Sequence, residues 1–290
     1  MASTRVRAGP RMNLPDSTDP HRRESCAGCA VRDRCLPSGL SQADLDSAEQ
    51  LVSTRLRLRR GAALYRREDA FKSFYVVRLG SLKSTVASDD AREQITGLHM
   101  AGEMVGFDGL ETGAHACDVV ALEDSEVCVF PFSRVDETIA CVPGLRGHFY
   151  RLMSREIVHK HGLMLMLGSM RADERLATFL LDLSDRHQSR GYSSTEFVLR
   201  MSRAEIGSFL GITIETVSRV MSQFAKDGLI DLQGVKQVKI ANVERLRQRA
   251  IGRETGKPGN RPAPAAEARP VVVHRLAARV ARHSLVEQFA

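Results

Sequence analysis

The spacing of apolar and polar positions predicts short β-strands in the first half of the chain. Between residues 56 and 132, apolar runs are interrupted by glycines and charged turns. The segment SFYVVRLGSLKSTVA is typical of two strands around Gly80, and EQITGLHMAGEMVGF of two more around Gly97 and Gly102. CDVVALEDSEVCVFPF predicts a further pair. Many short strands with regular turns favour an antiparallel sandwich or jelly roll.

The pattern changes to a helical period over residues 133–170, where apolar residues recur at intervals of three and four. Such a stripe can pack against the core of its own chain. We favour a seam between two subunits, because the stripe also contains Lys160 where an apolar residue is expected. A pair of Lys160 side chains facing each other would weaken a dimer without forbidding it. The predicted dimerisation residues are Tyr150, Met153, Ile157, Lys160, Met164 and Leu167.

The segment RMSRAEIGSFLGITIETVSRVMSQFAKDGLI predicts two short helices joined by a tight turn. Ser202 can cap a helix over 203–210, with Glu205 completing a capping box. Thr213 can cap a second helix over 214–227. The following LIDLQGVKQVKI is typical of a β-hairpin wing. Together these elements predict a winged helix-turn-helix whose second helix lies in the DNA major groove.

Polar residues near the start of that second helix are suited to reading bases. Arg219 can donate two hydrogen bonds to guanine, and Glu215 can accept one from cytosine. A surface ion pair between them, four residues apart, is the alternative interpretation, and the two are compatible. The candidate DNA-contacting residues are Ser202, Thr213, Glu215, Thr216, Ser218 and Arg219.

Composition narrows the class of protein. The 290 residues carry a net charge of +7, which fits a nucleic-acid partner without establishing one. The N-terminus has no apolar signal segment, and no apolar run is long enough to span a bilayer, so we expect a cytoplasmic protein without a membrane partner. We find no glycine-rich phosphate loop, nucleophile motif or paired carboxylates, and therefore expect no enzyme.

Three cysteines crowd into ESCAGCAVRDRC, at Cys26, Cys29 and Cys35. Thiols stay reduced in the cytosol, so metal binding is a better explanation than disulfides. With a fourth cysteine, the group suits either a tetrahedral zinc ion or an iron–sulfur cluster. Neighbouring arginines would stabilise the negative charge of either species, so they do not discriminate between them; these are Arg22, Arg23, Arg32 and Arg34.

The segments GITIETVSRVMSQFAKDGLI, EQITGLHMAGEMVGFDG and ALEDSEVCVFPF resemble the FNR/CRP superfamily of bacterial transcription regulators, in particular its FNR (fumarate and nitrate reduction) type. The resemblance covers roughly residues 26–245. It implies an α+β fold: an N-terminal β-roll (jelly-roll) sensor domain, a long dimerisation helix and a C-terminal winged helix-turn-helix. It also implies a homodimer that binds palindromic, TTGAT-like double-stranded DNA and contacts RNA polymerase.

The resemblance implies an oxygen-labile [4Fe–4S] cluster as cofactor. Cys26, Cys29 and Cys35 match the C-x2-C-x5-C group of FNR, and Cys128 matches its fourth ligand. The function implied is control of anaerobic or microaerobic gene expression. The alternative is a regulator of the same fold with a structural zinc or no cofactor, responding to another signal.

Two cysteines do not match the cluster ligands, and one position does not match the phosphate-binding pair of the cyclic-nucleotide branch. Cys117 and Cys141 have no counterpart among the cluster ligands and are expected to be ordinary small residues. In the cyclic-nucleotide branch an Arg-Ser pair binds the phosphate, and the matching place here is His115-Ala116. We therefore expect no cyclic nucleotide to bind.

The predicted organisation has five parts. Residues 1–24 form a flexible N-terminal segment, and 25–132 the cysteine-containing loop and β-roll sensor domain. Residues 133–170 form the dimerisation helix, 171–245 the winged helix-turn-helix, and 246–290 a basic, largely disordered tail.

Overall fold

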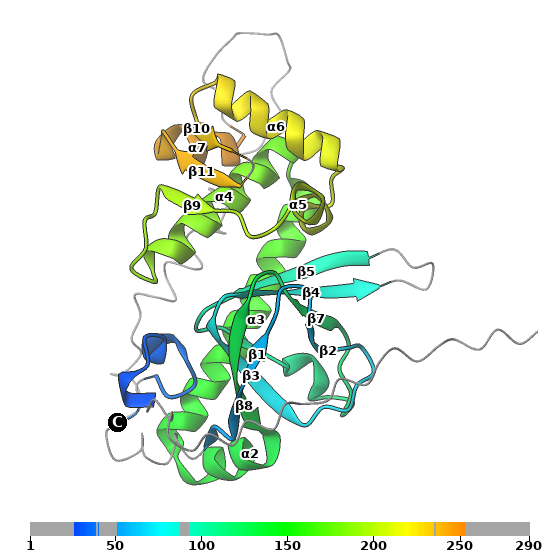
Figure 1. The fold of residues 1–290 in the computed structure, drawn as a ribbon, viewed down its shortest axis with the longest axis vertical. Helices are drawn as coiled ribbons and strands as arrows, with labels where there is room; N and C mark the ends of the chain where they lie inside the picture. Colours follow the sequence, from blue (N-terminus) through cyan, green and yellow to red (C-terminus); the bar gives the residue numbers. More distant parts are fainter. Residues whose placement is uncertain (1–25, 39, 41–50, 88–92, 235, 253–290) are drawn as a thin grey trace, which may run out of the picture.

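The computed structural model describes residues 26–38, 40, 51–87, 93–234 and 236–252 (Figure 1). The sequence also predicts a short helix beginning at Ser41, but residues 41–50 lie outside the described residues. The same holds for the predicted flexible segment 1–24 and for most of the predicted tail.

A β-roll of two four-stranded antiparallel sheets forms the lower half of the molecule in Figure 1. The order of the first sheet is β1 (Thr54–Leu58), β8 (Ser125–Pro131), β3 (Ser73–Leu79) and β6 (Met104–Val105). The order of the second is β2 (Ala63–Tyr65), β7 (Asp118–Ala121), β4 (Ser81–Ala87) and β5 (Glu93–Met100). The predicted jelly-roll fold of the N-terminal domain is confirmed.

The spacing predicted that Gly97 separates two strands, but it does not. It lies inside β5, where the pairing with β4 shifts register between Ser84 and Thr85. A Cβ atom at Gly97 would lie 2.8 Å from the His99 ring nitrogen Nε2, so a side chain has no room there. The glycine therefore permits a bulge in a continuous strand.

The predicted helix over 133–170 is two helices, α2 (Phe132–Cys141) and α3 (Pro143–Ser169). Val142 between them has extended backbone angles. Pro143 explains the break, because a proline disfavours helical geometry in the residue before it and suits the first turn of a new helix. The 27-residue α3 runs from the β-roll to the C-terminal domain (Figure 1).

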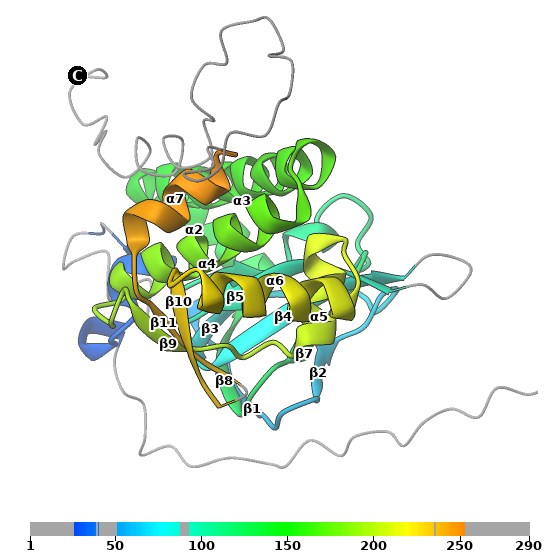
Figure 2. The same cartoon turned by 90° about the horizontal axis from the view of Figure 1, so that it is seen from above.

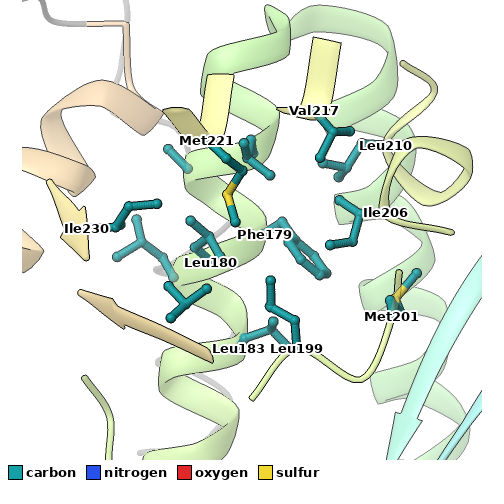
Figure 3. Packing of buried hydrophobic residues seen from close by; sticks show 14 of the residues in the cluster. Phe179, Leu180, Leu183, Leu199, Met201, Ile206, Leu210, Val217, Met221 and Ile230 are labelled. Carbon is teal, nitrogen blue, oxygen red and sulfur yellow. The ribbon is translucent and has the colours of Figure 1, made fainter. Parts of the chain in front are cut away.

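The C-terminal domain places four helices and a three-stranded sheet around one apolar core. The chain passes through α4 (Ala172–Gln188), β9 (Glu196–Val198), α5 (Arg203–Leu210) and α6 (Ile214–Lys226). It ends with β10 (Ile230–Gln233), β11 (Gln237–Ile240) and a fourth helix, α7 (Val243–Ala250). Side chains from α4, α5 and α6 interlock in the core, including Phe179, Ile206 and Met221 (Figure 3).

Two features of this domain differ from the predicted pattern. The strand β9 is not predicted, although it pairs with β11 to complete the wing sheet. The predicted boundary at residue 245 cuts through α7, whose Leu246 and Ala250 are buried in the domain core.

Within the described part of the chain, no helix is long and apolar enough to cross a membrane.

Candidate cofactor site and nucleic-acid interface

The helix-turn-helix has the caps that the sequence predicts. The Ser202 hydroxyl accepts a hydrogen bond from the Glu205 amide at 3.2 Å, and the Ser202 amide donates to the Glu205 carboxylate at 2.8 Å. Gly211 ends α5 with a φ of 62°, a left-handed geometry that suits glycine. The Thr213 hydroxyl accepts from the Thr216 amide at 3.3 Å and so begins α6. The hydroxyl groups of Ser202 and Thr213 therefore fix the helices themselves.

The predicted base-reading side chains lie on the exposed face of α6. Glu215, Ser218 and Arg219 are exposed, whereas Val217 and Val220 on the opposite face are buried. Figure 2, which looks down from the top of Figure 1, shows α6 lying across the outside of the molecule. This face is accessible to a DNA groove.

Glu215 is held at the start of α6. Hydrogen bonds from its own backbone and from the Thr213 side chain lower the pKa of Glu215. Among the described residues, no ion pair joins Glu215 to Arg219, so the surface ion pair considered above does not form here. Arg219 is free of that partner and can extend toward a base edge.

The three N-terminal cysteines lie on a loop of two short 3-10 helices, Cys26–Gly28 and Arg32–Arg34. Backbone hydrogen bonds curl this loop: the Cys29 amide donates to the Cys26 carbonyl at 3.2 Å, and the Cys35 amide donates to the Val31 carbonyl at 3.1 Å. The ring nitrogen Nε2 of His148 on α3 lies 3.1 Å from the Cys35 carbonyl oxygen. The loop is thereby attached to the long helix.

The four predicted ligands lie near one another. Cys35 and Cys128 are buried in the same apolar cluster, while Cys26 and Cys29 are half-buried. Burial raises the pKa of the Cys35 thiol, and nearby Cys128, Cys26 and Cys29 raise it further. Four thiols that oppose one another's ionisation need a positively charged group among them to ionise together.

Two arginines that the sequence had not indicated lie beside this group. Arg55 on β1 pairs in register with Cys128 on β8. Burial raises the pKa of the Cys128 thiol, whereas the guanidinium groups of Arg55 and Arg78 lower it. A cross-strand neighbour is visible only once the strand register is known, which is why Arg55 could not be predicted from the sequence.

The donor set fits an iron–sulfur cluster in its chemistry. Such clusters are held by four Cys thiolates, and positive charge beside the sulfurs stabilises them. Among the described residues, no three His, Cys, Asp or Glu side chains are arranged to hold a single metal ion.

The predicted dimer stripe divides between two faces of α3. Tyr150, Ile157 and Met164 are spaced by seven residues and are 59%, 54% and 70% exposed. Met153 instead packs against the core beneath the cysteine loop, and Leu167 is half-buried. The exposed row is the part of the stripe that a second subunit could cover.

The prediction that Lys160 lies in the seam is wrong. Its Nζ donates to the Thr96 carbonyl of β5 at 2.8 Å and pairs with Glu156 at 3.1 Å. Lys160 therefore faces the β-roll of its own chain. A half-buried ammonium satisfied by a carbonyl and a carboxylate is better placed there than beside a like charge.

Comparisons with known proteins agree with this arrangement. A model of the Crp-like helix-turn-helix domain matches residues 174–249, and one of the cyclic nucleotide-binding domain matches 55–140. The transcriptional regulatory protein Btr of Bordetella pertussis is 44% identical over 230 residues, 79% of this chain and 94% of that protein. The fumarate and nitrate reduction regulatory protein of Escherichia coli K12 is 39% identical over 225 residues, 78% of this chain and 90% of its own. This chain belongs to the FNR type of the FNR/CRP family.

A solved structure has the same fold as this FNR-type chain. FixK2 from Bradyrhizobium japonicum matches with a TM-score of 0.63 and 31% identity, covering 68% of this chain and 97% of that one. FNR-type proteins are DNA-binding transcription regulators rather than enzymes, which confirms the class predicted from the sequence.

A partly open cavity of about 330 Å3 lies between the β-roll and α3 of this FNR-type regulator. Of the described residues that line it, Lys160 alone carries a positive side chain, and Glu156 pairs with it. Asp108 supplies a carboxylate that accepts from the Ala116 amide at 2.9 Å and from the Tyr65 hydroxyl at 3.1 Å. The backbone amide at the position of the family's phosphate-binding pair thus already has an internal acceptor.

Proposed function

We propose that this protein is an oxygen-responsive transcription regulator with a [4Fe–4S] cluster on Cys26, Cys29, Cys35 and Cys128. What supports the proposal is that Cys35 of the loop and Cys128 of β8 are buried in one apolar cluster, and that Arg55 lies opposite Cys128 on the neighbouring strand. When bound, the cluster supplies reactivity toward oxygen. The chain's own part is to join a loop to the β-roll through Cys128, so that the loop is held only while all four thiolates share one cofactor.

The regulator acts in the cytoplasm as a homodimer that binds double-stranded DNA. The exposed row on α3 pairs two subunits, and their two α6 helices then read half-sites one DNA turn apart. Arg219 reads guanine and Glu215 the cytosine opposite it in a palindromic, TTGAT-like site. Bound to DNA, the dimer controls anaerobic or microaerobic genes through contact with RNA polymerase.

Cyclic nucleotide is not the signal. A phosphodiester in the β-roll cavity would meet the Asp108 carboxylate and a Lys160 already neutralised by Glu156. Without a free guanidinium, the phosphate has no charge partner to offset its loss of water.

The test is the metal and sulfide content of the anaerobically purified protein and its cysteine variants. Wild type should hold about four iron and four sulfide per subunit. Serine at Cys26, Cys29, Cys35 or Cys128 should remove most of the iron, because each supplies one ligand. Cys141→Ser and Cys117→Ser are matched controls that should keep it: Cys141 is exposed, and a serine at 117 can still donate to Asp108.

Full iron in Cys128→Ser would contradict the ligand assignment. One zinc per subunit without sulfide in the wild type would favour the structural-zinc alternative.

A further inference from the structure

We propose that the cysteine loop also positions the DNA-binding domain of its own chain, and that Arg34 is the positioning residue. This inference rests on the proposed function, since it adds a second consequence to cofactor binding. The Arg34 guanidinium donates to the Ser189 carbonyl at the end of α4, the first helix of the DNA-binding domain. Arg34 directly precedes Cys35, so a proposed ligand and this contact are neighbours in the chain.

The chemistry of a helix end favours the contact. The last carbonyls of a helix lack partners within the helix and carry partial negative charge, which a guanidinium group complements. Ser189 is the C-cap residue of α4. Figure 1 shows the cysteine loop, in dark blue, on the side of the molecule where α4 ends.

A second observation places the loop at the same point. Gly102, in the turn between β5 and β6, has a φ of 90°. A Cβ atom there would lie 2.7 Å from the Cβ of Arg34, so only glycine lets the loop approach this closely. The cysteine loop thus packs on the turn at residues 101–103 of the β-roll.

The same turn binds α4 and the residues that follow it. The Arg190 side chain donates to the Ala101 carbonyl at 2.9 Å, and the Glu103 carboxylate pairs with Arg186 at 2.7 Å and with Arg190 at 2.5 Å. The cysteine loop, the 101–103 turn and the end of α4 therefore meet at one junction. If the cysteine loop becomes disordered, the 101–103 turn and the end of α4 lose their contacts with it.

Movement of α4 reaches the recognition helix directly. Phe179 and Leu180 of α4 share a buried core with Val217 and Met221 of α6 (Figure 3). Because a packed core moves as one body, the placement of α4 sets the placement of α6. The cofactor state can then act on DNA binding in two ways, through the seam on α3 and through this junction within each chain.

The test compares Arg34→Ala with Arg59→Ala in the full chain, purified without oxygen. Arg59 is exposed in the turn that follows β1, and among the described residues no hydrogen bond or ion pair joins its side chain to the DNA-binding domain. Iron per subunit, the dimer fraction by sedimentation and the affinity for a palindromic TTGAT-like duplex are measured for each. Compared with wild type at equal iron content and dimer fraction, Arg34→Ala should bind DNA at least about fivefold more weakly. Arg59→Ala should match wild type, and Arg34→Lys should retain part of the affinity.

Arg190→Ala gives a second measurement from the other side of the junction, far from the thiols in the chain. It should weaken DNA binding in the same way, with iron and dimer retained. Equal DNA affinity in Arg34→Ala, Arg190→Ala and wild type overturns the inference. So does a loss of affinity that only follows lost iron or lost dimer. Wild type without iron overturns the proposed function instead, so the two failures are distinguishable.

Discussion

At the scale of single residues, His99 shows how burial sets a charge state. Its ring lies inside the β-roll on β5 and contacts the Ser84 hydroxyl. Burial lowers the pKa of His99 from 6.5 to about 4, although Glu156 and Glu103 act in the opposite direction. At pH values between about 4 and 6.5, the imidazole is therefore neutral in the folded protein and protonated in an unfolded chain.

This shift predicts a loss of stability in mild acid. Between pH 6.5 and about 4, the unfolded chain takes up a proton at His99 that the folded chain does not, so the free energy of unfolding falls as pH falls. From pH 7 to pH 5 the loss from this residue is about 2 kcal/mol. Denaturant unfolding at both pH values should show a smaller difference in His99→Gln than in wild type. His161→Gln, at an exposed position of α3, is the control and should keep the wild-type difference.

At the scale of elements, the caps show what could be predicted from the sequence. Ser202 with Glu205, and Thr213 with Thr216, act within three residues, so the helix-turn-helix and its boundaries are readable from the chain alone. Strand β9 depends on a distant partner, β11, and three residues carry too little pattern to reveal it. The direction of Lys160 likewise depends on the Thr96 carbonyl 64 positions away.

The candidate sites follow the same rule. The spacing of the three loop cysteines and the family resemblance identify the proposed ligands. The positive charge beside Cys128 comes from the strand register, and the contact of Arg34 with Ser189 spans 155 positions. Neither is a property of local sequence. The exposed face of α6 was predictable, because helix periodicity fixes which side is buried.

Base reading by α6 is testable with two variants of one helix. Arg219→Ala should lower the preference for the G·C pair of each half-site by about 1–3 kcal/mol, because a bidentate contact is lost. Binding to random DNA should be largely retained, since phosphate contacts supply it. Lys226→Ala removes an equal charge from the other end of α6 and should leave the preference unchanged. Competition between specific and random duplexes measures the preference of each variant. If Arg219→Ala lost equal affinity for the two DNAs, Arg219 would contact phosphate and not a base.

At the scale of the whole molecule, the domains of one chain are joined by polar contacts as well as by α3. Glu205 uses one carboxylate oxygen to cap α5 and the other to pair with Lys83 of β4 at 2.8 Å. The Ser208 hydroxyl accepts from the Ile95 amide at 3.0 Å. The helix-turn-helix is thus attached to the β-roll on the side opposite its DNA-reading face, which leaves α6 accessible while fixing its direction.

The exposed row on α3 is the surface that we propose for a second subunit. Three large apolar side chains in a row at heptad spacing favour a two-stranded helix seam. Because Lys160 faces its own β-roll, the balance between monomer and dimer does not depend on repulsion between two lysines in the seam. In the proposed dimer it would depend on the apolar area of Tyr150, Ile157 and Met164, at about 25 cal/mol per Å2 buried, and on how the loop steadies α3 through His148.

Ile157→Glu should therefore abolish the dimer, because two carboxylates would face each other in a desolvated seam. Sedimentation of the anaerobic protein should show monomer, with iron per subunit unchanged, since Ile157 lies outside the cysteine group. Specific DNA affinity should fall by more than tenfold because a single half-site is read. Arg155→Glu, at an exposed position of α3 outside the row, should remain dimeric. Lys160→Leu should remove the hydrogen bond to the Thr96 carbonyl and lower stability without increasing the dimer fraction. A dimer that survives Ile157→Glu would mean that the subunits meet through another surface.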